Sequence, residues 1–181
     1  MDTYKTDVDN ENNFTNDKEK SNDEYFLSLF SQLDQLWEAN DFENSGNILM
    51  EIIKLINDTS NLITFDYGNP KFIESIIRKL QDATHFDPHT KGQRVVCSLL
   101  QILITACNSS PIAISVLIEL QQVETFINLI NYPTLDVSEN AIKIITLTFN
   151  QFSDEGKSIA FPLLIQKAWD MCNKDDSNVN S

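Results

Sequence analysis

The sequence predicts an all-α fold from three observations. Apolar residues return every three or four positions along most of the chain, which places them on one face of a helix. A capping residue precedes proline at Asn69-Pro70 and Ser110-Pro111, a pairing typical of helix starts. Glycine occurs only four times, too rarely for a β-sandwich with many glycine turns. The β-branched stretches ISVLIEL and KIITLTF allow a strand as the alternative, but the flanking caps favour helices.

The first third of the chain predicts a disordered tail and two helices. Residues 1–21 contain almost nothing apolar and many Asn, Asp and Lys residues, so we expect them to be disordered. Ser21 and Glu24 have the spacing of a capping box, which predicts a helix from about 22 to 39. A second helix, from about 45 to 57, carries a stripe of isoleucine and leucine.

The later helices are delimited by caps and polar breaks. Asn69-Pro70 opens the third helix, and Asp87-Pro88 repeats the signal before the most apolar helix, 94–107. Because helix 94–107 is apolar on nearly all sides, we expect it to be central. Asp136 and Glu139 form another capping box. Further helices are expected after Ser110-Pro111, from near Val123, over 138–152 and through Trp169, before a disordered tail at 175–181.

Composition limits the function classes. No run of 18 apolar residues occurs and the N-terminus is acidic and polar, which predicts neither a membrane span nor a signal peptide. Cys97, Cys107 and Cys172 are odd in number and unpaired by spacing, as expected for a cytoplasmic or nuclear protein. The net charge of −14 disfavours binding to nucleic acid.

The second half of the chain contains an internal repeat. Moving residues 96–123 by 46 positions places their apolar pattern on that of 142–169, and the polar break at 108–110 falls on 154–156. An offset of about 50 similarly places 52–60 on the stretch ending at this break. A unit of about 40–50 residues with one long helix, a polar turn and two further helices is typical of a helical solenoid.

The stretch SLLQILITACNSSPIAISVLIELQQVETFINLI resembles an armadillo repeat, and the similarity of pattern covers residues 45–173. The resemblance implies a short armadillo/HEAT-like right-handed α-solenoid of two to three repeats over 22–174. It also implies a non-enzymatic protein-interaction module, acting as an adaptor, a scaffold or a subunit of a multi-subunit complex. Peptide-binding members carry an asparagine ladder, but Ile102 and Thr148 stand at the matching positions, so that ladder does not carry over. Size, acidity and element order are also similar to armadillo-type Hsp70 nucleotide-exchange co-chaperones. This second resemblance implies the alternative function, a co-chaperone that binds Hsp70 and acts as its nucleotide-exchange factor.

No pattern of catalytic or ligand-binding residues stands out. His85 and His89 flank Asp87, but three or four ligands are usual in metal sites, so a surface loop is the better interpretation. Cys107 ends an apolar helix and is better explained as a small core residue than as a nucleophile. The glycines are isolated and form no phosphate-binding loop. We therefore expect no enzyme activity, cofactor, metal or small-molecule substrate.

Two sets of residues are candidate partner contacts. The first is a net-positive stretch that predicts a docking patch for an acidic partner surface, with an ordinary solvated face as the alternative. This stretch contains Lys71, Arg78, Lys79, Lys91 and Arg94. From helical spacing, we expect Lys71, Arg78 and Lys79 to lie on the outer face of the third helix, opposite its apolar stripe. The second comprises polar interruptions on the expected concave face, which the edge of the stack would also explain: Gln101, Thr105, Lys143 and Thr146.

A short stack of repeats also has two end faces that need covering. Phe26, Phe30 and Trp37 are expected to cover the first end, and Trp169 the last. An uncovered apolar end would require a partner or a dimer.

Overall fold

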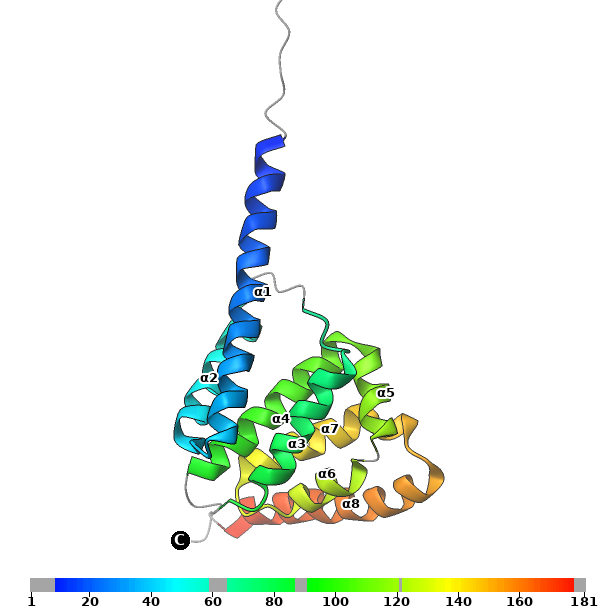
Figure 1. Ribbon diagram of the computed structural model, residues 1–181. Helices are drawn as coiled ribbons and strands as arrows, with labels where there is room; N and C mark the ends of the chain where they lie inside the picture. The colour runs from blue at the N-terminus through cyan, green and yellow to red at the C-terminus, as the bar shows by residue number, and fades with distance from the viewer. Residues whose placement is uncertain (1–8, 59–64, 87–90, 121, 178–181) are drawn as a thin grey trace, which may run out of the picture. The chain divides into compact units, whose positions relative to one another are not determined.

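The computed structural model describes residues 9–58, 65–86, 91–120 and 122–177, with side chains described there except at 9–21, 91, 123 and 170–177. These residues are all-helical and include no strand, which confirms the predicted fold class (Figure 1). The strand alternative for ISVLIEL and KIITLTF is therefore wrong. The helices belong to two compact units, spanning residues 1–65 and 66–181. The expected grouping of residues 22–174 into one domain stays a prediction.

The first unit contains α1 (Asp9–Glu38) and α2 (Phe42–Asn57). α1 begins well before residue 22, so the helix includes part of the expected disordered tail, and the Ser21–Glu24 capping box is wrong. Residues 9–21 contain many weak helix formers such as Asn and Asp but no glycine or proline, the two residues that oppose a helix most strongly. Residues 1–8 of that tail lie outside the described residues.

The turn between α1 and α2 depends on Asn40 and Asp41. Asn40 adopts a left-handed backbone with φ 57°, and the Asp41 N–H donates to the Leu36 carbonyl at 2.9 Å. This is the usual way that a helix ends on a residue that tolerates positive φ. The Asp41 carboxylate then accepts from the Asn44 backbone N–H at 3.2 Å, so α2 starts at Phe42 rather than near 45.

Apolar and aromatic side chains hold the first unit together. Phe26, Leu29 and Leu33 of α1 are buried, as are Leu49 and Ile52 of α2. All five belong to the apolar positions that recur at helical spacing in the sequence. Three ring pairs add to the packing, with centroids 4.8–5.4 Å apart: Phe26–Phe30, Phe26–Phe65 and Trp37–Phe42.

The second unit contains the remaining helices, whose starts test the predicted caps. Asn69 caps α3 as predicted, since its Oδ1 accepts from the Lys71 N–H at 3.0 Å. Ser110 precedes α5 as predicted, but its hydroxyl caps no N–H. The Asp136–Glu139 capping box is wrong because Thr134 precedes the first turn, and Asp87-Pro88 lies outside the described residues. The elements are α3 (Pro70–Ala83), α4 (Lys91–Ser109), α5 (Pro111–Glu119), α6 (Val123–Ile130), α7 (Leu135–Thr148), η1 (Phe149–Gln151) and α8 (Asp154–Ser177).

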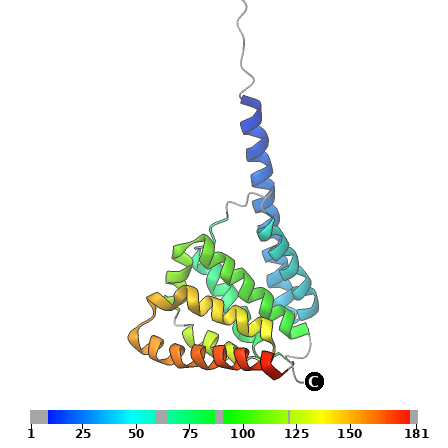
Figure 2. The same ribbon diagram turned by 180° about the vertical axis from the view of Figure 1, so that it is seen from behind.

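α4 is the centre of the second unit, as its apolar sequence predicted. It packs against α3, α5 and α7, and Leu99, Leu100 and Leu103 are completely buried. α6 joins α7, where the buried Ser138 hydroxyl donates to the Ile130 carbonyl at 2.7 Å. α8 contacts α6 and lies at one edge of the unit in both views (Figure 1 and Figure 2).

The two stretches that the sequence offset of 46 aligns differ in structure in their last part. α5 and α6 meet at a bend of 98°, whereas α8 continues through the matching positions without a break. Gln122 supports the bend: its Nε2 donates to the Leu120 carbonyl at 2.7 Å, and its Oε1 accepts from Gln81 and Thr125. Ala168 stands 46 positions later and has no polar side chain to do this. Among the described helices, no single one is long and apolar enough to cross a membrane; α5 and α6 reach that length and composition only together.

Candidate interaction surfaces

The predicted basic patch is only partly exposed. Lys71 and Arg78 of α3 face solvent, but Lys79 is only 6% exposed, so its placement on the outer face is wrong. At about 100° per residue, Lys79 lies about 20° from the buried Phe72 and about 80° from Lys71. Its aliphatic stem packs along the core, and Nζ donates to Ser75 Oγ at 2.8 Å.

The charge around the two exposed bases is balanced rather than positive. Glu74 and Asp82 of α3 are also exposed and share the helix face of Lys71 and Arg78. Arg94 is exposed on α4, whereas the side chain of Lys91 lies outside the described residues. A docking role for these bases stays a prediction, and the exposed side chains of α3 add no excess of positive charge to it, because its third base, Lys79, is buried.

The candidate histidine site is only half described. His85 is exposed just after α3, and residues 87–90, which include Asp87 and His89, lie outside the described part of the chain. Within the described residues, no three histidine, cysteine or acidic side chains gather as metal ligands.

The four residues predicted for the concave face lie on two helices that pack together, α4 and α7. Gln101 and Lys143 are both exposed. The hydroxyl of Thr105 donates to the Gln101 carbonyl at 3.1 Å, and that of Thr146 donates to the Ile142 carbonyl at 2.8 Å. Both threonines therefore satisfy their hydroxyls within their own helices.

Sequence reasoning missed a contact that connects these two helices. Asn140 Nδ2 of α7 donates to Cys97 Sγ of α4 at 3.2 Å, and Gln101 Nε2 lies 3.9 Å from the same sulfur. Burial raises the pKa of the Cys97 thiol, while the Asn140 hydrogen bond lowers it, and Asp136 and Lys143 act on it in opposite directions. Gln101 and Lys143 thus lie near one half-buried thiol, and their role in binding stays a prediction.

Cys107 is a core residue, as predicted. Its side chain is buried, and burial raises the pKa of its thiol to about 11. The thiol is therefore protonated at neutral pH, which is the unreactive form.

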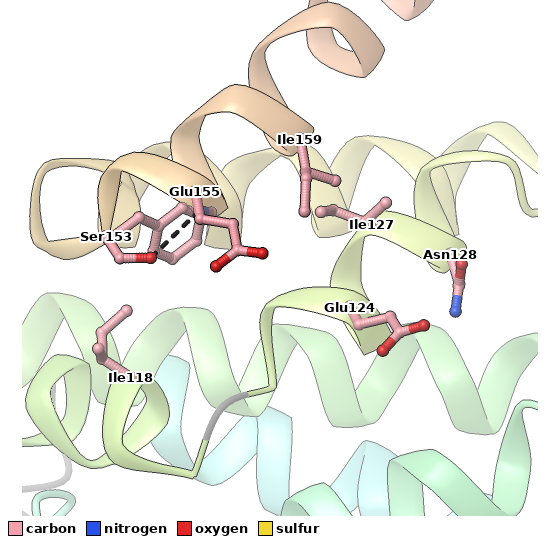
Figure 3. Close-up of a pocket in the computed structure, with 9 residues that line it drawn as sticks. Ile118, Glu124, Ile127, Asn128, Ser153, Glu155 and Ile159 are labelled. Atoms are coloured by element: carbon pink, nitrogen blue, oxygen red, sulfur yellow. Dashed lines mark hydrogen bonds between the residues drawn. The ribbon is translucent and has the colours of Figure 1, made fainter.

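A cavity of about 800 Å³ opens where α5 ends, α6 begins and α8 begins (Figure 3). Its apolar wall is formed by side chains from all three segments. Its polar groups include carboxylates from α6 and α8, each in the first turn of its helix. The Ser153 hydroxyl at the edge accepts the Gly156 N–H at 3.2 Å, which satisfies one free donor of α8. The lining residues are Ile118, Glu124, Ile127, Asn128, Phe152, Ser153, Glu155, Gly156 and Ile159.

The outward face of α8 is apolar. Phe161, Ile165 and Trp169, named here the α8 row, follow one another at four-residue spacing and are 55%, 54% and 67% exposed. Ala160 lies on the other side of the helix and is completely buried. The expectation that Trp169 covers the end of the stack is therefore wrong. The stretch IAFPLLIQKAW is apolar on most sides and has only Gln166 and Lys167 as polar residues, so its spacing did not indicate which face would be buried.

The chain matches no protein-family model, no curated protein and no solved structure. The resemblance to armadillo repeats consequently depends on the sequence pattern.

Proposed function

We propose that this chain is a non-enzymatic protein-interaction module that binds a partner protein through the α8 row. The exposure of Phe161, Ile165 and Trp169 carries the proposal. A surface helix usually presents polar residues to solvent, whereas α8 presents three large apolar side chains there. Fully burying one such side chain is worth about 1.5–3 kcal/mol, so a partner that covers the row gains several kcal/mol.

The composition of the row favours a protein as the partner. Tryptophan and other aromatic side chains are enriched where partner proteins contribute most binding energy. A contiguous exposed apolar surface is also unusual on a protein that acts alone. The proposed role is that of an adaptor, a scaffold or a complex subunit.

The proposal includes a short armadillo/HEAT-like solenoid of two to three repeats. The order of a long helix, a polar turn and a second helix occurs twice, in α4–α5 and in α7–α8. α4 and α7 begin at Lys91 and Leu135, and α5 and α8 begin at Pro111 and Asp154, so both offsets are close to the sequence repeat. α8 then belongs to the last repeat, where a stack has an apolar end to cover.

The test compares partner capture by the full-length protein and by two double variants. Ile165→Ser with Trp169→Ser removes most of the α8 row. The matched control, Ile112→Ser with Leu135→Ser, removes two equally exposed apolar side chains from α5 and α7. Proteins captured from extract are quantified by mass spectrometry, after circular dichroism has confirmed that each variant is folded.

We expect the row variant to lose captured partners that the control variant retains. A photo-crosslinker at Ser158, which is exposed on the same side of α8, should attach to those same partners. Equal capture by all three proteins would show that the α8 row is not the binding surface.

A further inference from the structure

The cavity beside α8 combines apolar walls with an acidic edge. Ile118, Ile127 and Ile159 approach it from α5, α6 and α8 (Figure 3). A volume of about 800 Å³ lies within the range of ligand-binding cavities. The walls alone would accept any apolar group, so the polar residues decide what fits.

Glu124 and Glu155 supply the charge at this edge. They extend from α6 and α8 on opposite sides of the opening (Figure 3), and both are exposed. Neither carboxylate is paired with a cation among the described residues. Asn128 follows Glu124 by one helical turn and adds an amide to the same side.

The charges argue against an anion and against a bare metal ion. Helix N-termini attract anions, but a carboxylate already occupies the first turn of both α6 and α8. A metal ion gains nothing from the isoleucine walls, and no cluster of three ligating side chains occurs in the described part of the chain. The fitting ligand has a cationic tip and an apolar stem.

We infer that the cavity binds an arginine side chain of a basic segment of the partner protein. The three-carbon stem matches the isoleucine walls, and the planar guanidinium offers five N–H donors to the carboxylates of Glu124 and Glu155. Long-range attraction by a chain of net charge −14 favours the approach of such a segment. That the arginine belongs to a protein rests on the proposed function.

The test is an NMR titration of the ¹⁵N-labelled full-length protein with the peptide Ac-Ala-Leu-Arg-Leu-Ala-NH₂. The control peptide carries citrulline, a neutral residue of the same shape, in place of arginine. We expect saturable shifts of the Glu124, Asn128 and Gly156 amides, with an affinity about tenfold higher for the arginine peptide at low salt. Glu124→Gln with Glu155→Gln should reduce that affinity to the citrulline level.

The control variant, Glu74→Gln with Asp82→Asn, removes an equal number of negative charges from exposed positions on α3. It should retain most of the preference for arginine. Equal loss in both variants would assign the effect to net charge, and equal affinity of the two peptides would refute a guanidinium site. Binding of agmatine as tight as that of the arginine peptide would assign the cavity to a free small cation instead.

The two proposals fail separately. A failed titration, with capture still dependent on the α8 row, would remove the arginine site and leave the interaction module. A positive titration, with partner capture that does not depend on the α8 row, would support the arginine site and refute the α8 row as the binding surface.

Discussion

Gly68→Ala is expected to destabilise the unit spanning 66–181, whereas Gly156→Ala should stabilise it. Gly68 is buried, and a Cβ there would lie 2.6 Å from Ser110 Oγ and 3.1 Å from Ile112 Cβ. Real Cβ atoms do not approach another atom to 2.6 Å, so the Ser110 hydroxyl must rotate away. The 3.1 Å contact with Ile112 Cβ is tighter than usual, so the start of α5 or the loop before α3 must also shift by a few tenths of an ångström. Overpacking of this kind costs about 1–3 kcal/mol. Alanine also lowers the entropy of the unfolded chain, which stabilises the folded state by about 0.4–1 kcal/mol. The free energy of unfolding should therefore fall by about 1–2 kcal/mol.

Gly156 provides the matched control because a Cβ fits there without a steric clash. The nearest atoms to a Cβ there, on Phe152 and Ser153, lie 3.5 Å away, which is ordinary van der Waals contact. Alanine in the first turn of α8 should therefore raise the free energy of unfolding by about 0.5–1 kcal/mol, the usual advantage over glycine in a helix.

Urea denaturation of the full-length variants, followed by circular dichroism at 222 nm, measures both effects. Ser110→Ala removes the clashing hydroxyl and loses no capping bond, since Ser110 caps no N–H. Combined with Gly68→Ala, it should restore about 1 kcal/mol relative to the sum of the single changes. A Gly68→Ala protein as stable as the unmodified chain, or a double variant with purely additive loss, would refute the steric reasoning.

Three further predictions concern single contacts. Ser138→Ala should lower the free energy of unfolding by about 1–2 kcal/mol in the same urea series, since the buried Ile130 carbonyl loses its donor; an unchanged value would contradict this. Because burial raises the pKa of Cys107 to about 11, its thiol should react with iodoacetamide at pH 8 far more slowly in the folded than in the unfolded chain. The folded-state pKa lies above the unfolded one, so this thiol favours folding below the unfolded pKa and loses that contribution as the pH rises toward about 11. The hydrogen bond from Tyr25 to the Glu51 carboxylate, 2.7 Å long, raises the pKa of Tyr25, so Glu51→Gln should lower it in a ¹³C NMR titration assigned with Tyr25→Phe.

Helix boundaries were predictable from the sequence where a side chain marks them. Asn69 caps α3 with its own amide oxygen, and that start was correctly predicted. Thr134 precedes α7 without a side-chain capping bond, so the nearby Asp136 and Glu139 indicated a false start. The bend after α5 depends on Gln122, whose partners include Gln81 from a distant helix, and local sequence gives no sign of such a contact.

The candidate surfaces were harder to predict because they depend on packing. Lys79 is buried because its position in the helical repeat puts it beside Phe72, and a lysine can keep its aliphatic stem in the core. Its charge therefore did not indicate its exposure. The cavity collects residues from three segments that are separate in sequence, so no local pattern contains it. The α8 row was not predictable because apolar and polar residues are spread around the helix without a clear apolar stripe, so the buried face is selected by packing, including the contact with α6.

The central position of α4 has a consequence for synthesis of the chain. α4 is covered by α3, which precedes it, and by α5 and α7, which follow it. While α7 is still being made, the emerged part of the chain lacks one of the three helices that pack against α4 and its buried leucines in the finished protein. We therefore expect the unit to complete its fold only after about residue 148 has emerged from the ribosome, and until then its most apolar helix is incompletely covered and exposed to aggregation.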